Sequence, residues 1–177
     1  MSVSPVSNSA SQRSSARPGA RRCTVGNRLT SILASGSSSS HGLLFGVKTT
    51  AYTHTEADHL PYGIKSAIGT DLKYGTIRSA AADWSVYPVG TTFKIQGEPY
   101  LYEVDDYGSA LVGTRTIDLY KPSLSAMNSW GARHVNINVI HWGSVTRSLA
   151  ILKPRERKKG HIHAMVTKLE SGPEPSI

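Results

Sequence analysis

The sequence predicts a mainly β (all-β) protein built around one six-stranded barrel, with one or two short helices and a disordered N-terminal segment. Short segments in which apolar and polar residues alternate, separated by Gly and Pro, run from Val47 to Gly143, as an all-β barrel or sandwich requires. Among these segments, one has the composition of a helix instead. A chain of 177 residues has room for one such domain plus tails.

The alternation that favours strands begins in VKTTAYT, residues 47–53, and recurs at residues 91–97, 99–106, 114–120 and 134–142. In the last of these segments, Val135, Ile137 and Val139 fall on one face, because successive side chains of a strand point to opposite sides of the sheet. Together these segments indicate roughly six strands.

Two helices are predicted. In SLSAMNSWGA, Ser123 or Ser125 can cap the N-terminus and Gly131 can supply the left-handed stop. In the tail, Pro154 prevents one continuous helix, and a short helix is expected around residues 161–169.

Charge and composition divide the chain into three parts. Residues 1–46 hold five Arg and no acid, residues 47–143 hold eight Lys and Arg against nine Asp and Glu, and residues 144–177 hold seven against three. The first part is too poor in aliphatic side chains to offset chain entropy, so we expect a disordered leader. The second is the barrel domain, and the third is a basic tail with the short helix. The near-neutral middle part lacks the clustered basic face of a nucleic-acid reader.

The leader leaves three interpretations open: an organellar transit peptide, a truncated signal peptide, or a misassigned start codon. No apolar run reaches the about 18 residues that a spanning helix needs. Cys23 is the only cysteine, which excludes an intrachain disulfide and a cysteine-based metal site. His54 and His59 stand near Glu56 and Asp58, but a polar loop explains them better than a metal site does.

Three aspartates are the candidate chemical groups. Asp83 lies in AADWSVYPVGT, Asp106 in EVDDYGSALVG and Asp118 in TRTIDLY. Each stands beside Gly, Pro or an alternating apolar run, which places it at a strand end or in a tight turn. A purely structural role stays open for each, because Asp commonly forms turns through its own side-chain hydrogen bonds.

The succession of these blocks, with TTAYT before them and a helix ending in WGARHVNINVI after them, resembles the 3D domain. This three-aspartate double-psi β-barrel is found in bacterial peptidoglycan lytic transglycosylases of the MltA type and in stationary-phase survival proteins. The resemblance covers about a hundred residues. It implies that Asp83, Asp106 and Asp118 are the family's three aspartates, with Asp105 as the competing choice for the second.

The resemblance implies an enzyme that cleaves the MurNAc–GlcNAc bond with formation of 1,6-anhydroMurNAc. In the family the third aspartate is the acid/base, so Asp118 is assigned that role here, and Asp106 and Asp83 would tune it, orient it or bind the sugar. A tethered nucleophile, the 6-hydroxyl of the muramic acid, lets one carboxyl group act twice. Two carboxylates placed close together would also raise the pKa of one of them.

Sugar binding needs flat apolar surfaces with polar rims, and several aromatic residues lie near the motif blocks. Core packing explains most aromatic residues in a small barrel, but Tyr52 and Tyr107 are expected in the groove. Gly108 and Ser109 belong to the same block as Tyr107. The family's opening strand lines the groove, which adds Thr53 and Thr50 as possible hydrogen-bonding residues.

The expected partner is therefore the peptidoglycan glycan strand, bound by a monomer in the cell envelope, periplasmic or secreted, with neither a cofactor nor a metal ion. Two other functions stay open. One extra residue between Gly113 and Asp118, relative to the family pattern, keeps open a non-catalytic barrel that binds or remodels wall polysaccharide. The basic flanks are the argument for nucleic-acid binding, and the near-neutral charge of the barrel is the argument against it.

Overall fold

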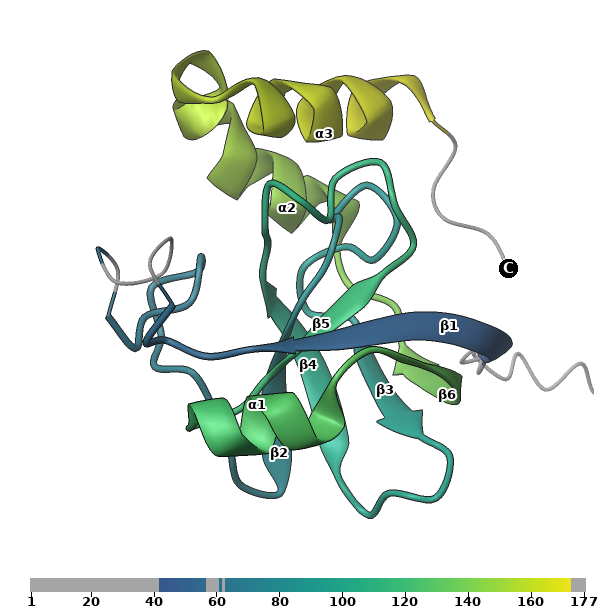
Figure 1. The fold of residues 1–177 in the computed structure, drawn as a ribbon. Helices are drawn as coiled ribbons and strands as arrows, with labels where there is room; N and C mark the ends of the chain where they lie inside the picture. The colour runs from purple at the N-terminus through teal and green to yellow at the C-terminus, as the bar shows by residue number, and fades with distance from the viewer. Residues whose placement is uncertain (1–41, 57–60, 62, 173–177) are drawn as a thin grey trace, which may run out of the picture. The chain divides into compact units, whose positions relative to one another are not determined.

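The computed structural model describes residues 42–56, 61 and 63–172, and it confirms the mainly β class. Six strands form one closed barrel in the order β1-β5-β2-β4-β3-β6 (Figure 1). Of the predicted leader, residues 1–46, residues 1–41 lie outside the described part of the chain. The first strand begins at Gly42, five residues before the predicted start of the domain at Val47.

The strands differ in length, from 4 residues in β3 and β5 to 11 in β1. Their bounds are β1 Gly42–Tyr52, β2 Ile77–Ala81, β3 Thr92–Ile95, β4 Leu101–Asp106, β5 Ile117–Tyr120 and β6 Arg133–His141. All five segments predicted from alternation contain a strand. The remaining strand, β2, was not specified, because four of its five residues are buried and its sequence therefore lacks the alternation of a half-exposed strand.

Two strand pairs are parallel, β1 with β5 and β2 with β4, and the other four are antiparallel. A parallel pair needs a long crossover connection, and here the crossovers carry the loops that surround one end of the barrel. The register places Ala81, the last residue of β2, opposite both Asp106, the last residue of β4, and Asp118 of β5.

The barrel interior is filled by large side chains. Trp84, Phe93, Tyr102, Ile117 and Leu119 are completely buried. The rings of Phe93 and Tyr102 stack with centroids 5.4 Å apart. Each such side chain stabilises the fold by about 1.5–3 kcal/mol through burial alone, so the barrel has a continuous packed core.

The helix α1, Leu124–Trp130, follows β5 as predicted. Ser123 is its N-cap, with a side-chain oxygen that accepts from the Ala126 N–H, and Gly131 ends it at φ 62°. The cap therefore falls on Ser123 rather than Ser125.

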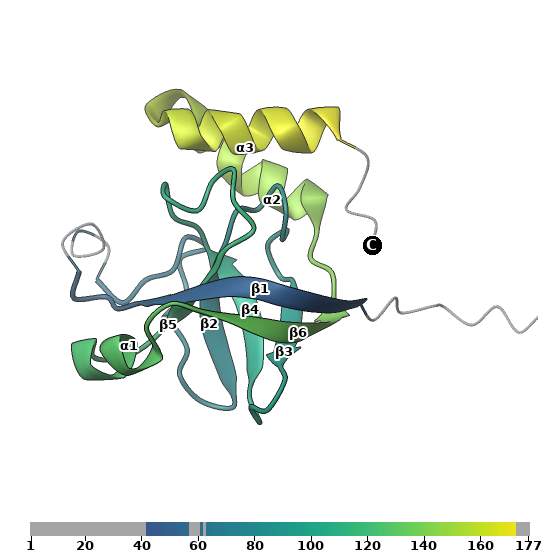
Figure 2. The same ribbon diagram turned by 45° about the vertical axis from the view of Figure 1, so that its right-hand side comes forward.

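The C-terminal segment is more ordered than its composition suggested. It forms α2 (Val145–Leu152), the 3-10 helix η2 (Lys153–Lys158) and α3 (Gly160–Ser171). The helix α3 is the predicted one, extended at both ends, whereas α2 was not predicted. Both α-helices lie together beside one end of the barrel (Figure 2).

Apolar packing attaches these helices to the barrel. Leu152, Ile162, Met165, Val166 and Leu169 belong to the same buried cluster as the barrel interior. A polar contact adds to it, since the backbone N–H of Val89 donates to the buried Ser148 hydroxyl at 3.0 Å. No helix in the described part of the chain is long and apolar enough to cross a membrane.

Candidate active site

Two of the three aspartates lie in one row across the barrel wall. Thr50 on β1 pairs with Asp118 on β5, Asp118 pairs with Ala81 on β2, and Ala81 pairs with Asp106 on β4. Residues in register point to the same face of a sheet. Asp118 and Asp106 therefore face the same side, two strand spacings or roughly 10 Å apart at Cα, with the small side chain of Ala81 between them.

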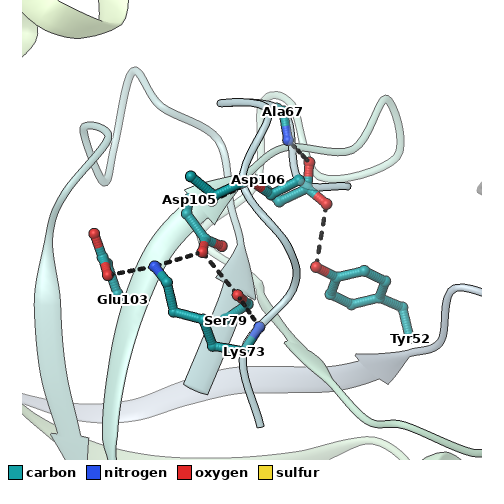
Figure 3. A network of polar contacts seen from close by, with 9 residues as sticks. Tyr52, Ala67, Lys73, Ser79, Glu103, Asp105 and Asp106 are labelled. Atoms are coloured by element: carbon teal, nitrogen blue, oxygen red, sulfur yellow. Dashed lines mark hydrogen bonds and ion pairs between the residues drawn. The ribbon is translucent and has the colours of Figure 1, made fainter. Parts of the chain in front are cut away.

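A β-bulge aims Asp106 into this row. Ala80 pairs with Val104 and the next residue, Ala81, pairs with Asp106, so Asp105 is an extra residue in β4. A bulge bends a strand and redirects the side chains beside it. The carboxylates of Asp105 and Asp106 consequently point to different surroundings, as Figure 3 shows.

Asp105, the competing choice for the second aspartate, belongs to a buried network. Its Oδ2 accepts from the Ser79 hydroxyl at 2.7 Å and from Lys73 Nζ at 3.1 Å, and Lys73 also contacts Glu103 at 2.7 Å. Among the described residues its Oδ1 has no hydrogen-bond partner. Burial raises the pKa of Asp105, and the bonds from Ser79 and Lys73 offset only part of that effect. This carboxyl group holds the bulge in place.

Asp106 is buried and accepts hydrogen bonds through both oxygens. Oδ2 accepts from the Tyr52 hydroxyl at 3.1 Å, and Oδ1 accepts from the N–H groups of Ala67 at 3.1 Å and Tyr107 at 2.9 Å. Burial and then the charge of Asp106 raise the pKa of Tyr52 well above its usual value. Tyr52 therefore stays protonated and donates to Asp106, which joins β1, β4 and the loop around Ala67 (Figure 3).

Asp118 is half-buried on β5. Its Oδ1 accepts from the Thr50 hydroxyl at 2.8 Å, a contact that follows from the pairing of the two residues across β1 and β5. Thr50 thus orients the carboxyl group without covering it.

Both carboxylates open into one pocket of about 800 Å³. Its volume is within the range of small-molecule sites. Four of the five predicted sugar-binding residues line it. The described residues of its lining are Ala51, Tyr52, Glu56, Lys65, Ser66, Ala67, Ile68, Gly69, Ala81, Asp106, Tyr107, Gly108, Ser109, Ala110, Leu111, Asp118, Arg155, Lys159, His161 and Ile162.

Asp83 is not part of that lining. It is completely buried after β2, where Oδ1 accepts from the N–H of Ser85 at 2.9 Å and from its hydroxyl at 2.6 Å. Its Oδ2 accepts from the Gly113 N–H at 2.7 Å. These bonds close a turn and fasten the segment that follows Tyr107, and Oδ2 also lies 3.9 Å from Lys168 Nζ on α3.

Thr53 also lies away from the described lining. It is completely buried, and its backbone N–H donates to Glu56 at 3.0 Å. Of the other aromatic residues near the motifs, Trp84 is buried and donates to the Asp106 carbonyl at 2.8 Å, and its ring meets the Tyr107 ring edge-on at 5.0 Å. Trp84 therefore supports two pocket residues from beneath.

Four basic residues of the described lining were not predicted: Lys65, Arg155, Lys159 and His161. Three of them lie in the segment that was predicted to be a basic tail with a short helix. The spacing of Ile162, Met165, Val166 and Leu169 is the signal that could have found them, because an apolar face of that period predicts a helix packed on the domain. The basic residues beside such a helix would then lie close to the barrel.

Within residues 42–56, 61 and 63–172, no group of three His, Cys, Asp or Glu side chains could hold a metal ion. His54 instead contacts the Tyr120 hydroxyl through Nδ1 at 2.8 Å. Asp58 and His59 lie outside the described residues.

Residues 78–141 match the 3D domain family. The chain contains a 3D domain. The match runs from β2 to the end of β6 and includes all three aspartates, whereas β1 and the C-terminal helices lie outside it. No curated protein matches the chain.

Proposed function

We propose that this 3D-domain protein is a peptidoglycan lytic transglycosylase in which Asp118 is the general acid/base. The observation that carries the proposal is the position of Asp118, half-buried at the edge of an about 800 Å³ pocket with Asp106 on the same row of the barrel. A half-buried carboxyl group at the edge of the pocket can reach a bound sugar, which a group enclosed by the core cannot do.

One carboxyl group suffices for the reaction. Protonated Asp118 gives its proton to the glycosidic oxygen while the bond from that oxygen to C1 of MurNAc breaks. The resulting carboxylate then takes the proton of the 6-hydroxyl of the same sugar as O6 bonds to C1. The acid is restored, no water is consumed, and the tethered nucleophile has the entropic advantage of an intramolecular reaction.

The neighbouring residues have supporting roles in this proposal. Thr50 holds the Asp118 carboxyl group in one orientation. Asp106 is engaged by Tyr52, Ala67 and Tyr107, which suits a group that fixes the pocket wall and contacts the sugar. Tyr52, Tyr107, Gly108 and Ser109 provide the surface on which the glycan lies. Asp83 and Thr53 act from outside the pocket by holding the adjoining loops.

The proposed substrate sets the location. Peptidoglycan glycan strands lie outside the cytoplasmic membrane, so the protein would act in the cell envelope, in the periplasm or after secretion. A single chain supplies every residue of the proposed site, which is consistent with a monomer.

A non-catalytic barrel that binds cell-wall polysaccharide is the second candidate. The positions that flank Asp118 in the row are Thr50 and Ala81, so the second carboxylate is one strand further away than two adjacent carboxylates would be. The mutual effect on pKa that adjacent carboxylates exert is correspondingly weaker. A carboxyl group that lacks this effect is ionised near neutral pH and has no proton for the glycosidic oxygen, so a barrel of that kind would bind glycan without cleaving it.

The test is mass spectrometry of peptidoglycan incubated with the full-length protein, with Asp118→Asn and with Glu170→Gln. Asp118→Asn removes the ionisable group and preserves the shape. Glu170→Gln is the matched control, because this exposed glutamate pairs with Lys153 on the outside of α3. We expect anhydromuropeptides from the parent and the control and none from Asp118→Asn.

Other products would change the assignment. Reducing-end sugars from the parent would indicate a hydrolase. Anhydro products from folded Asp118→Asn at the parental rate would contradict the role of Asp118. Glycan binding without any product from the parent would favour the binding barrel.

A further inference from the structure

The pocket has two walls of opposite charge. The barrel contributes the carboxylates Asp106 and Asp118, and the loop after β1 adds Glu56. The cationic residues Lys65, Arg155 and Lys159 line the pocket from other segments. Arg155 and Lys159 come from the C-terminal segment, outside residues 78–141 that match the 3D domain. The cationic wall is therefore an addition to the domain, and its chemistry is separate from the acid/base step.

Packing holds this wall in place. Arg155 Nη1 donates to the Ala67 carbonyl at 2.9 Å and lies 3.4 Å from the Tyr107 hydroxyl. The N–H of Ala67 donates to Asp106, so Ala67 connects the cationic wall to the carboxylate wall. Three residues after Lys159, Ile162 is buried in the core and fixes the start of α3.

His161 lines the pocket beside Lys159, on the same C-terminal segment. It is half-buried in the pocket lining, with its ring centroid 6.1 Å from that of Tyr107. Burial and then the charge of Lys159 lower the pKa of His161, so the imidazole is uncharged at neutral pH. At neutral pH the positive charge of this wall is therefore that of lysine and arginine alone.

A pocket of this kind orients a ligand that is itself charged on one side. An anionic substituent is attracted to Lys159 and Arg155 and repelled by Asp106 and Asp118. The uncharged part of the ligand then faces the carboxylates, where a neutral glycosidic bond can accept a proton. A neutral sugar would gain nothing from the cationic wall.

We propose that the C-terminal segment makes the pocket specific for glycans that carry a carboxylate. Lys159 binds this carboxylate, and Arg155 increases the positive charge around it. The inference rests on the proposed function. Two sources provide the carboxylate in peptidoglycan: the lactyl group of a muramic acid without peptide, and the stem peptide of a substituted one.

The experiment measures binding rather than cleavage, so that its outcome does not depend on turnover. The full-length Asp118→Asn protein is titrated with three probes: peptide-free peptidoglycan strands, peptide-bearing strands, and neutral N-acetylglucosamine oligomers of matched length. We expect at least one anionic probe to bind about tenfold or more tightly than the neutral oligomer, which is the worth of one hydrogen bond to a charged group. The probe that binds more tightly identifies the source of the carboxylate.

Adding Lys159→Gln should weaken the binding of the anionic strands and so remove most of their advantage over the neutral oligomer. The matched control is Lys153→Gln, because Lys153 lies in the same segment but is exposed and pairs with Glu170. The preference for anionic strands should also decrease as the salt concentration rises. A urea unfolding curve for each variant verifies that the charge, and not the fold, has changed.

Equal affinity of the parent for anionic and neutral glycans would overturn the proposal, as would an unchanged preference in Lys159→Gln or the absence of binding to all three probes. These outcomes are distinct from failure of the proposed function. If binding depends on charge but the parent with Asp118 intact forms no anhydro products, the cationic wall still selects the ligand and the barrel is non-catalytic. If the parent forms anhydro products but binding does not depend on charge, the proposed enzymatic function stands and the proposed role of the cationic wall is wrong.

Discussion

Replacement of Asp83 should damage stability far more than chemistry. Asp83 is completely buried and accepts three hydrogen bonds, two from Ser85 and one from Gly113. Hydrogen bonds to a charged group contribute about 1.5–3 kcal/mol each, so Asp83→Ala removes at most about 5–9 kcal/mol. Gly113 is exposed and Ser85 half-buried, and both regain water when the acceptor is lost. We therefore expect a loss of about 3–4 kcal/mol, roughly half of that bound.

The assay is urea unfolding, supported by thermal unfolding. A loss of that size lowers Tm by about 10 °C in a protein of this length. Asp83→Asn retains one acceptor for Ser85 but turns an amide group toward the Gly113 N–H, so it should lose about 1.5–3 kcal/mol. Asp71→Asn is the control, because the exposed pair of Asp71 with Lys65 contributes about 0–1 kcal/mol.

Activity separates the two roles. Measured well below its Tm, Asp83→Asn should retain most of the glycan cleavage per folded molecule, whereas Asp118→Asn should have none. If the free energy of unfolding of Asp83→Ala lies within about 1 kcal/mol of that of the parent and the variant has no activity, the structural role of Asp83 is wrong. Asp83 would then take part in the reaction.

Two further outcomes follow from the same contacts. A Cβ on Gly143 would lie 2.2 Å from the Pro88 carbonyl oxygen and 2.3 Å from that of Val89. Gly143→Ala should therefore lower the free energy of unfolding in urea by about 3 kcal/mol or more, as at other overpacked sites. Gly160→Ala is the control and should unfold like the parent, because a Cβ there meets nothing within 4 Å. Because the pKa of Asp105 is raised in the folded state, the folded protein binds the Asp105 proton more tightly than the unfolded chain does. Protonation of Asp105 therefore stabilises the fold fully below the unfolded pKa of about 3.9, and this stabilisation is lost as pH rises through the folded pKa. The parent should therefore lose stability relative to Asp105→Asn as pH increases across that window, and parallel urea curves for the two proteins over the window would contradict this account.

The sequence predicted the barrel because most strands of a small barrel are half-exposed and carry an alternating pattern. It did not specify β2, which is buried between β4 and β5 and contains Ser79, Ala80 and Ala81. The capped helix α1 was predictable from Ser123 and Gly131 alone, since a cap is a local feature. The helix α2 was not, because its stability comes from contacts with Val89 and the core that a local pattern does not show.

The candidate site was predictable only in part for the same reason. The motif blocks named Asp106 and Asp118, but their relation depends on β2 lying between them and on the bulge at Asp105, both of which arise from non-local pairing. The structural role of Asp83 depends on Gly113, thirty residues away in sequence. Lys159 and Arg155 come together with the barrel only after α3 has packed.

The working unit must extend beyond the residues that match the 3D domain. In the closed order, β1 lies between β5 and β6, so residues 78–141 alone would leave both strands with an unpaired edge, which a stable barrel avoids. The same strand supplies Thr50 to Asp118 and Tyr52 to Asp106. Both pocket aspartates therefore depend on a segment before the domain match, and the cationic wall depends on one after it. The domain brings the three aspartates, and the flanking segments determine how two of them face a ligand.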